Sequence, residues 1–390
     1  MKLFVILSRF PYPLEKGDKL RAYHQIKELH ALGYEIHLSC LTDRVVKDES
    51  LNEIKKYCEK IHVFKLNPIL IYLNTILQFF TNKPFQVGYF FERSIAKKIH
   101  KLVEKEKPDH IYCQLIRTTE YVKNIMDVPK TLDYMDALSK GMFRRAQISK
   151  GLYKWAFNME GKRLNEYENR IFDYFNYHTI ISEQDRNLIN HPSANEILLI
   201  ENGIDEGFFE YASTKTAEYD IIFVGNMNYP PNIKCAEYIV EEILPLLAKD
   251  TKVALCGASP HQSIIKLAKN PNVTVTGWVD DIKAAYKSGK IFVAPLFIGT
   301  GLQNKLLEAM ALGIPCITTP LANNALHATN EKEIFIATDP KEFAKTINLL
   351  LGDEQKASEI ALAGKDFVME NFSWNRSVRK LHELIFQQKE

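Results

Sequence analysis

A glycine-flanked turn that runs into a helix is the stretch of this chain best suited to chemistry. Residues 299–315 read GTGLQNKLLEAMALGIP, with two glycines ahead of the predicted helix and Lys305 in its first turns. Glycines let a ligand approach the backbone, and the free N–H groups and positive dipole end of a helix favour an anion. Glu308 follows three positions later and shares the helix face of Lys305. The segment therefore predicts a phosphate site, although an exposed i,i+3 ion pair would have the same spacing.

The sequence also predicts where this helix ends. Leu306, Leu307 and Met310 recur at helical spacing, Gly313 stands where a helix commonly terminates, and Pro315 prevents continuation. Lys305 and Glu308 are thus expected on a short helix whose other face is apolar.

The elements that must position this helix follow an alternating pattern. Lys2–Ser8 predicts a buried strand. Apolar residues at helical spacing then predict a helix that ends at Gly33, and Glu35–Cys40 predicts the next strand. Such βαβ units bind ligands at the carboxyl ends of their parallel strands. The loop that contains Gly17 and Asp18 should therefore face a cleft, although the two residues could equally serve as loop and N-cap.

The same alternation continues beyond a polar linker at 210–218, where Asp220–Val224 runs into a glycine turn. The predicted fold is α/β, with two doubly wound Rossmann-like domains facing a cleft. The predicted domains are residues 1–209 and 210–371, followed by a C-terminal helix at 372–390.

Length and composition fit this organisation. The 390 residues suffice for two domains with separate cores. Six cysteines without a Cys-x-x-Cys pair indicate reduced, cytoplasmic usage. The apolar run Leu3–Leu7 is too short for a signal peptide.

A second apolar run, Ile69–Phe80, is interrupted only by Asn74, Thr75 and Gln78. It is too short to span a bilayer, so it predicts a buried core helix. Contact with a membrane surface or a lipid acceptor is the alternative. Residues 51–150 carry 18 basic against 10 acidic residues. The lysines near the run are Lys55, Lys56, Lys60, Lys65, Lys83, Lys97 and Lys98.

The run GTGLQNKLLEAMALGIPCITT resembles the signature of retaining GT-B glycosyltransferases of family 4, in which Glu-x7-Glu precedes Ala-Met-Ala-x-Gly-x-Pro. Glu308 matches the second Glu of that element, and Thr300 stands where the family usually has the first. Residues 130–140 and 160–168 resemble the middle of bacterial sugar transferases associated with exopolysaccharide gene systems.

The resemblance implies that residues 1–209 form the acceptor side, that residues 210–371 bind the nucleotide sugar, and that the helix at 372–390 crosses back to the first domain. It also implies roles for individual residues. Lys305 would stabilise the departing diphosphate, Glu308 would hold the ribose hydroxyls, and Thr300 would lie near the donor sugar. The implied donor-binding residues are Gly225, Asn226, Asn232, Gly277, Trp278, Val279, Gly299, Gly301, Leu302, Gln303 and Asn304. The implied acceptor or sugar side comprises Gly17, Asp18, Gln114 and Asp136.

The predicted function is retaining transfer of a hexose-type sugar from a nucleoside diphosphate to a glycan or lipid-linked acceptor, in surface polysaccharide or glycoconjugate biosynthesis. No metal, cofactor or nucleic-acid partner is expected. The expected location is the cytoplasm, and peripheral contact with the inner face of the membrane is considered for the N-terminal domain.

Two other functions remain open at this point. A sugar-nucleotide epimerase of the same fold would need no acceptor. A catalytically silent partner subunit is favoured by the replacements at Thr300, Gln114, Asn226 and Asn232, because each departs from the pattern of the family.

Overall fold

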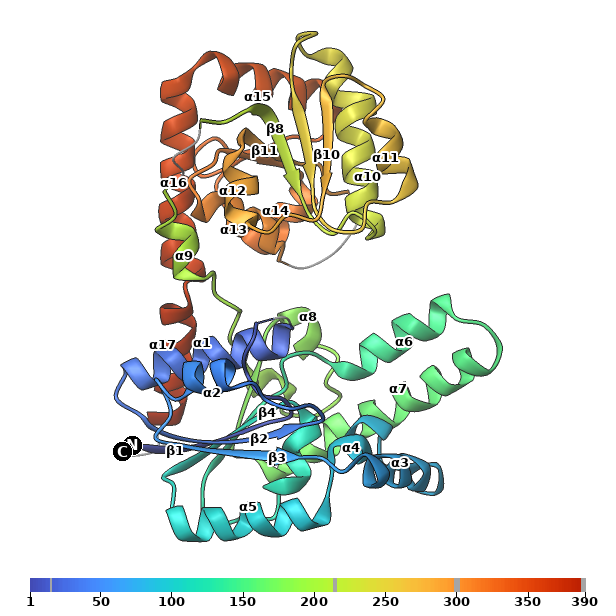
Figure 1. Ribbon diagram of the computed structural model, residues 1–390, viewed down its shortest axis with the longest axis vertical. Coiled ribbons are helices and arrows are strands. Elements are labelled where there is room, and N and C mark those ends of the chain that lie inside the picture. Colours follow the sequence, from blue (N-terminus) through green and yellow to red (C-terminus); the bar gives the residue numbers. More distant parts are fainter. Residues whose placement is uncertain (15, 213–215, 298–301, 387–390) are drawn as a thin grey trace. The chain divides into compact units, whose positions relative to one another are not determined.

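The computed structural model describes residues 1–14, 16–212, 216–297 and 302–386 (Figure 1). The chain divides into two compact units, each with its own parallel sheet. Unit 1 comprises Met1–Asn202 with Ser377–Glu390, and unit 2 comprises Gly203–Arg376.

Unit 1 has a seven-stranded parallel sheet with the order β3-β2-β1-β4-β5-β6-β7. Its strands are β1 (Lys2–Leu7), β2 (Glu35–Thr42), β3 (Lys60–Lys65), β4 (His110–Gln114), β5 (Lys130–Asp133), β6 (Tyr177–Ile180) and β7 (Leu198–Leu199). Its helices are α1 (Gly17–Ala31), α2 (Asp48–Ile54), α3 (Pro68–Leu77), α4 (Phe85–Phe90), α5 (Arg93–Glu106), α6 (Leu138–Ile148), α7 (Gly151–Ile171) and α8 (Glu183–Arg186). Short 3-10 turns include η1 (Gln78–Phe80) and η2 (Ile116–Tyr121).

Alternation along the strands builds a core on each face of this sheet. Leu3, Val5 and Leu7 of β1 join the cluster that also contains residues of α1, whereas Phe4 and Ile6 join the cluster with residues of α5. Figure 1 shows α1 and α5 on opposite faces of the sheet. Successive side chains of a strand point to opposite faces, so a continuous apolar strand is buried on both sides.

Unit 2 has a six-stranded parallel sheet with the order β10-β9-β8-β11-β12-β13. Its strands are β8 (Tyr219–Val224), β9 (Val253–Cys256), β10 (Val273–Gly277), β11 (Gly289–Ala294), β12 (Cys316–Thr318) and β13 (Phe335–Ile336). Its helices are α9 (Glu206–Phe209), α10 (Pro230–Tyr238), α11 (Gln262–Leu267), α12 (Ile282–Lys287), α13 (Asn304–Ala311), α14 (Pro320–Leu326), α15 (Pro340–Gly352) and α16 (Glu354–Phe372). The predicted fold class of two doubly wound α/β domains is confirmed.

The division between the units falls after Asn202, whereas the sequence predicted it after residue 209. The backbone N–H of Ile204 donates to the Phe372 carbonyl at 2.7 Å. A Cβ at Gly203 would lie 2.2 Å from the Trp374 nitrogen, so only glycine fits there. These contacts tie the start of unit 2 to the end of α16.

The last helix, α17 (Trp374–Phe386), continues the chain into unit 1. Val378, Leu381 and Ile385 are buried in the same cluster as α1. The Ser377 hydroxyl donates to the Glu201 carbonyl, and Lys380 pairs with the Glu201 carboxylate at 3.0 Å.

The prediction that Ile69–Phe80 forms a buried core helix is wrong. The run does form α3 and η1, but α3 has no buried residue. Two of its three polar residues, Asn74 and Gln78, face the protein, and apolar side chains are left on the outer face. Among the described residues, no helix is long and apolar enough to cross a membrane.

Candidate functional site

The helix α13 carries Lys305 and Glu308, and its ends are fixed by the local sequence. Gly313 has φ of +65°, its N–H donates to the Met310 carbonyl at 2.8 Å, and the Ile314 N–H donates to the Ala309 carbonyl at 3.1 Å. This pair of bonds is a Schellman motif, which ends the helix where the glycine predicted. Leu306, Leu307, Ala309, Met310 and Ala311 are buried, so the opposite face is anchored in the core.

Lys305 is half-buried at the start of α13. Its Nζ donates to Asn232 Oδ1 at 2.6 Å and lies 5.6 Å from the centre of the Phe223 ring. Burial lowers the pKa of this ammonium. An ammonium has three N–H donors, and the described residues accept from only one of them. Lys305 can therefore donate to a ligand.

Asn232 connects Lys305 to the predicted turn after β8. Its Nδ2 donates to the Asn226 carbonyl at 2.9 Å. A Cβ at Gly225 would lie 2.7 Å from Asn232 Nδ2, so a side chain there would displace the Asn232 amide. Gly225, Asn226, Asn232 and Lys305 thus form one contiguous group.

Glu308 has a different partner from Lys305. The Tyr286 hydroxyl, buried on α12, donates to Glu308 Oε2 at 2.7 Å. Burial raises the pKa of Glu308, and the hydrogen bond from Tyr286 opposes that rise. Lys305 and Glu308 are half-buried with separate neutral partners, so they do not form the exposed ion pair that the spacing also allowed.

Three glycines draw the carboxyl ends of β8, β9 and β10 together. A Cβ at Gly257, whose φ is +145°, would lie 1.8 Å from the Gly225 carbonyl oxygen. The Gly257 N–H donates to the Gly277 carbonyl at 3.0 Å. Trp278, which follows Gly277, is 74% exposed, and Val279 is half-buried. Gly257 was not predicted, because the sequence does not show that its backbone meets that of Gly225.

The remaining donor-side predictions lie around the start of α13. Leu302 and Gln303 directly precede the helix, and Asn304 is its exposed first residue. Gly299, Thr300 and Gly301 lie outside the described residues.

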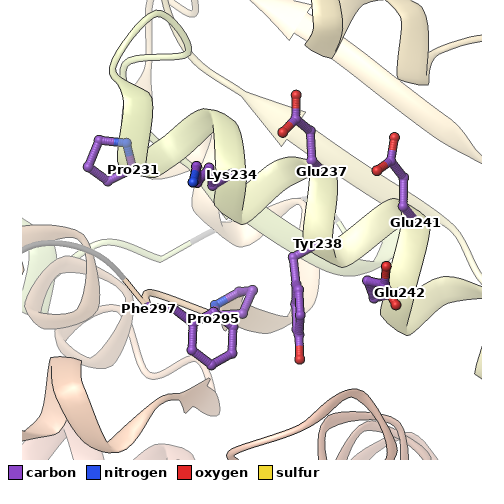
Figure 2. A pocket seen from close by; sticks show the side chains of 8 residues that line it. All are labelled: Pro231, Lys234, Glu237, Tyr238, Glu241, Glu242, Pro295 and Phe297. Carbon is purple, nitrogen blue, oxygen red and sulfur yellow. The ribbon is translucent and has the colours of Figure 1, made fainter.

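A pocket of about 330 Å³ opens beside α10, and its lining includes Pro231, the residue before Asn232 (Figure 2). The ring of Phe297 lies 4.9 Å from the ring of Tyr238 in its wall. Its other lining residues are Lys234, Glu237, Glu241, Glu242 and Pro295. Lys305 and Glu308 do not line it, and three carboxylates make it a poor site for a diphosphate.

In unit 1, the acceptor-side predictions follow three neighbouring strands. β1 pairs with β4, and β4 pairs with β5. Gly17 is the exposed first residue of α1, and Asp18 pairs with Arg9, which follows β1. Gln114 ends β4 with a buried side chain whose Nε2 has no partner among the described residues. Asp136 follows β5 with an exposed side chain. The pKa of Asp136 is raised, first by desolvation from the surrounding protein atoms and then by the negative charges of Asp185 and Asp133.

Two arginines at this edge were not predicted. Arg9 and Arg117 both lie over the Phe90 ring, at 5.7 Å and 5.4 Å from its centre. Arg117 donates through Nε and Nη2 to the neutral Gln86 Oε1. Burial and then the charge of Arg9 lower the pKa of Arg117 to about 10. The alternation of helices and strands in the sequence does not reveal that two arginines 108 positions apart lie over the same ring.

A further ion pair, between Arg21 and Asp133, lies wholly inside unit 1. Arg21 Nε donates to Asp133 Oδ2 at 2.6 Å and Nη2 donates to Oδ1 at 3.2 Å. Asp133 also accepts from the Tyr112 hydroxyl at 2.7 Å and the Thr179 hydroxyl at 3.0 Å. Asp133 is therefore occupied by protein donors. No group of three or more metal-binding side chains occurs within the described ranges.

Comparisons with known proteins agree on the architecture. Residues 218–353 match the family model "Glycosyl transferases group 1". The chain is 21% identical over 415 residues to an uncharacterized 44.6 kDa protein in the cps region of Klebsiella pneumoniae, with 99% of each chain covered. HepE from Anabaena, solved with UDP, matches with a TM-score of 0.64 at 15% identity, over 99% of this chain and 100% of that one.

The chain has the GT-B fold. Staphylococcus aureus TarM, solved with UDP, fondaparinux and alpha-GlcNAc-glycerol, matches with a TM-score of 0.62 at 12% identity, over 98% of this chain and 99% of that one. The family match covers the part of this GT-B protein that holds Lys305, Glu308, Asn226 and Asn232. A glycosyltransferase is the function class that these matches support.

Proposed function

We propose that this GT-B protein is a retaining glycosyltransferase that moves a hexose-type sugar from a uridine diphosphate sugar to a glycan or lipid-linked acceptor. The observation that carries the proposal is the pair of under-occupied polar groups on α13. Lys305 lies at the start of α13 and Glu308 about one turn later, and each has one neutral protein partner. Both lie in the segment that matches group 1 glycosyltransferases.

The expected division of labour follows from charge. As the bond from the sugar to the diphosphate breaks, its electrons move to the departing phosphate oxygen. Lys305 and the N-terminal end of α13 would then stabilise the growing negative charge. The carboxylate of Glu308 would accept hydrogen bonds from the ribose hydroxyls.

Retention needs no second catalytic carboxylate. The acceptor hydroxyl would attack the anomeric carbon from the face that the diphosphate leaves, and its proton would pass to the departing phosphate oxygen. Such a step requires a preorganised cation more than a general base, and Lys305 supplies one.

Uridine is proposed because the HepE and TarM structures named above contain UDP. Thermal unfolding with UDP, GDP, dTDP and CMP tests this choice. A ligand at 100 times its dissociation constant adds about 2.7 kcal/mol to the free energy of unfolding. The preferred nucleotide should therefore raise the midpoint temperature of unfolding more than the other three nucleotides do. Equal midpoints with all four nucleotides would remove the donor site from the proposal.

The transfer is further proposed to need no divalent metal, because Lys305 and the helix start supply the positive charge. EDTA should leave the rate of transfer unchanged. Loss of activity that magnesium or manganese restores would contradict this charge scheme.

Product analysis separates the proposal from an epimerase or a silent subunit. A transferase consumes the UDP-sugar only with an acceptor and keeps the anomeric configuration, which proton NMR of the product reports. Release of an altered sugar without acceptor would indicate an epimerase. Binding to another transferase without measurable nucleotide affinity would indicate a silent subunit.

A further inference from the structure

The α3–η1 segment of unit 1 is amphipathic in the reverse of the usual sense. A helix at the surface of a globular protein normally turns its apolar face to the core. Here Asn74 Nδ2 donates to the Phe91 carbonyl at 2.6 Å, so the polar face is turned inward. One turn later, the Gln78 carbonyl accepts from Arg163 Nη1 of α7 at 2.7 Å. Asn74 and Gln78 are four residues apart and therefore define one face of the helix.

The opposite face is apolar and exposed. Phe80 is 83% exposed and Leu73 is 47% exposed. The exposed apolar side chains of this segment are Ile69, Leu70, Tyr72, Leu73, Ile76, Leu77, Phe79 and Phe80, here called the α3 surface. Exposed apolar patches of this kind on a monomer mark contact sites. The segment from 60 to 91 contains no Asp or Glu.

The neighbouring α6–α7 hairpin adds positive charge and aromatic side chains. Figure 1 shows α3 and the far end of the hairpin projecting from the same side of the unit 1 sheet, and Arg163 joins α7 to η1. Residues 137–159 contain five basic residues and no acidic one. Around the hairpin tip the exposed residues include Arg144, Arg145, Lys150, Leu152, Tyr153, Lys154 and Trp155.

We propose that the α3 surface, with the basic tip of the α6–α7 hairpin beside it, docks this protein in the plane of an anionic lipid bilayer. An apolar helix face rimmed by Trp, Tyr and basic side chains is the composition that lies at a bilayer interface. The long stems of Lys and Arg reach the headgroups while apolar side chains enter the acyl boundary. This proposal does not depend on the transferase chemistry.

Charge also argues against a second copy of the chain as the occupant. A two-fold contact is self-complementary, so the α3 surface would meet another α3 surface and each basic hairpin would lie near its equivalent. Like charges at such a contact repel, whereas an anionic bilayer neutralises them.

Co-sedimentation of the full-length chain with vesicles tests the proposal. The protein should bind vesicles of phosphatidylcholine with phosphatidylglycerol more tightly than vesicles of phosphatidylcholine alone. Leu73→Asp should weaken binding by at least roughly tenfold, because it removes an exposed leucine that the bilayer would bury and adds a charge at the apolar boundary. The matched control is Leu349→Asp, at a leucine of α15 that is 45% exposed, and it should bind as the unmodified protein does.

The basic tip has its own variant. Lys150→Ala with Lys154→Ala should weaken binding to the anionic vesicles by roughly 30-fold, with a smaller effect on the neutral ones. Unchanged thermal midpoints of all variants exclude unfolding as the cause.

Three results would overturn the proposal. The first is no binding to either vesicle, and the second is equal loss in Leu73→Asp and Leu349→Asp. The third is a dimer in sedimentation velocity that Leu73→Asp dissociates, since a second copy would then cover the α3 surface.

Discussion

The two units each place a basic and an acidic side chain close to their sheets, but they satisfy these charges in different ways. In unit 1, Arg21 and Asp133 are fully buried and bind each other through two N–H donors. Arg21 also donates to the Ile200 carbonyl and to Asn202 Oδ1, both at 2.9 Å. In unit 2, Lys305 and Glu308 are half-buried and each has a single neutral partner.

We propose that this difference separates a structural pair, Arg21 and Asp133, from a ligand-binding pair, Lys305 and Glu308. Each nitrogen of the Arg21 guanidinium and each oxygen of the Asp133 carboxylate already has a protein partner, so this buried pair has little left to offer a ligand. It holds α1 against β5. Under-occupied charges are costly to keep in a folded protein, so they are found where a ligand completes them. The pKa shifts are consistent with this cost, because burial lowers the pKa of Lys305 and raises that of Glu308, and both shifts disfavour the charged form.

The largest effect is expected from breaking the structural pair. Arg21→Met leaves Asp133 as a buried carboxylate without its cation, which should cost about 3–5 kcal/mol in the free energy of unfolding. Urea denaturation measures this cost. A change below about 1 kcal/mol would show that the other donors to Asp133 suffice and that the pair is not structural.

Lys305→Met should act on catalysis instead. We expect kcat/KM to fall by a factor equivalent to about 2–4 kcal/mol of lost transition-state stabilisation. Most of the loss should be in kcat, because the cation acts as charge develops on the diphosphate. Unfolding should not become easier, since the substitution removes an ammonium that burial already disfavours. Lys305→Arg should recover part of the rate, because a planar guanidinium cannot sit where a compact ammonium did. Lys266→Met, at an exposed lysine of α11, is the matched control and should leave the rate unchanged.

Glu308→Gln should weaken UDP binding by about 1–3 kcal/mol, because a charge-assisted hydrogen bond becomes a neutral one. Calorimetric titration with UDP and with 2′-deoxy-UDP isolates the ribose contact. The preference for UDP should shrink in the variant. An equal preference in both proteins would place the ribose elsewhere.

The smallest effect is expected from Tyr286→Phe, at about 1 kcal/mol in UDP affinity. The Tyr286 hydroxyl lowers the pKa of Glu308, so its removal raises that pKa further. In the proposed site the carboxylate form of Glu308 would bind the ribose, so affinity should be lost as pH falls through this pKa. The loss should therefore begin at a higher pH in the variant, and an identical pH profile would assign Tyr286 to packing alone.

Local signals made α13 predictable from sequence. Gly313 and Pro315 mark its end, and the spacing of Lys305 and Glu308 places both on one face. The alternation of strands and helices likewise predicted two parallel sheets. These features depend on residues close in the chain, where backbone geometry dictates the outcome.

Long-range partners were not predictable in the same way. Arg21 and Asp133 are 112 positions apart, and Tyr286 is 22 positions from Glu308. Tyr286 has the spacing of an ordinary core residue of α12, and only the fold shows its hydroxyl aimed at a carboxylate. The burial of α3 was predicted wrongly for a related reason. The spacing of apolar residues reveals that a helix has an apolar and a polar face, but it does not reveal which face the rest of the protein covers.

A crystal structure of the complex with UDP tests the central claim most directly. The account predicts that Lys305 Nζ lies about 3 Å from a diphosphate oxygen and that a Glu308 oxygen lies as close to a ribose hydroxyl. The Arg21–Asp133 pair should remain unchanged. UDP bound without contact to Lys305 and Glu308, for example in the acidic pocket beside α10 (Figure 2), would contradict the account.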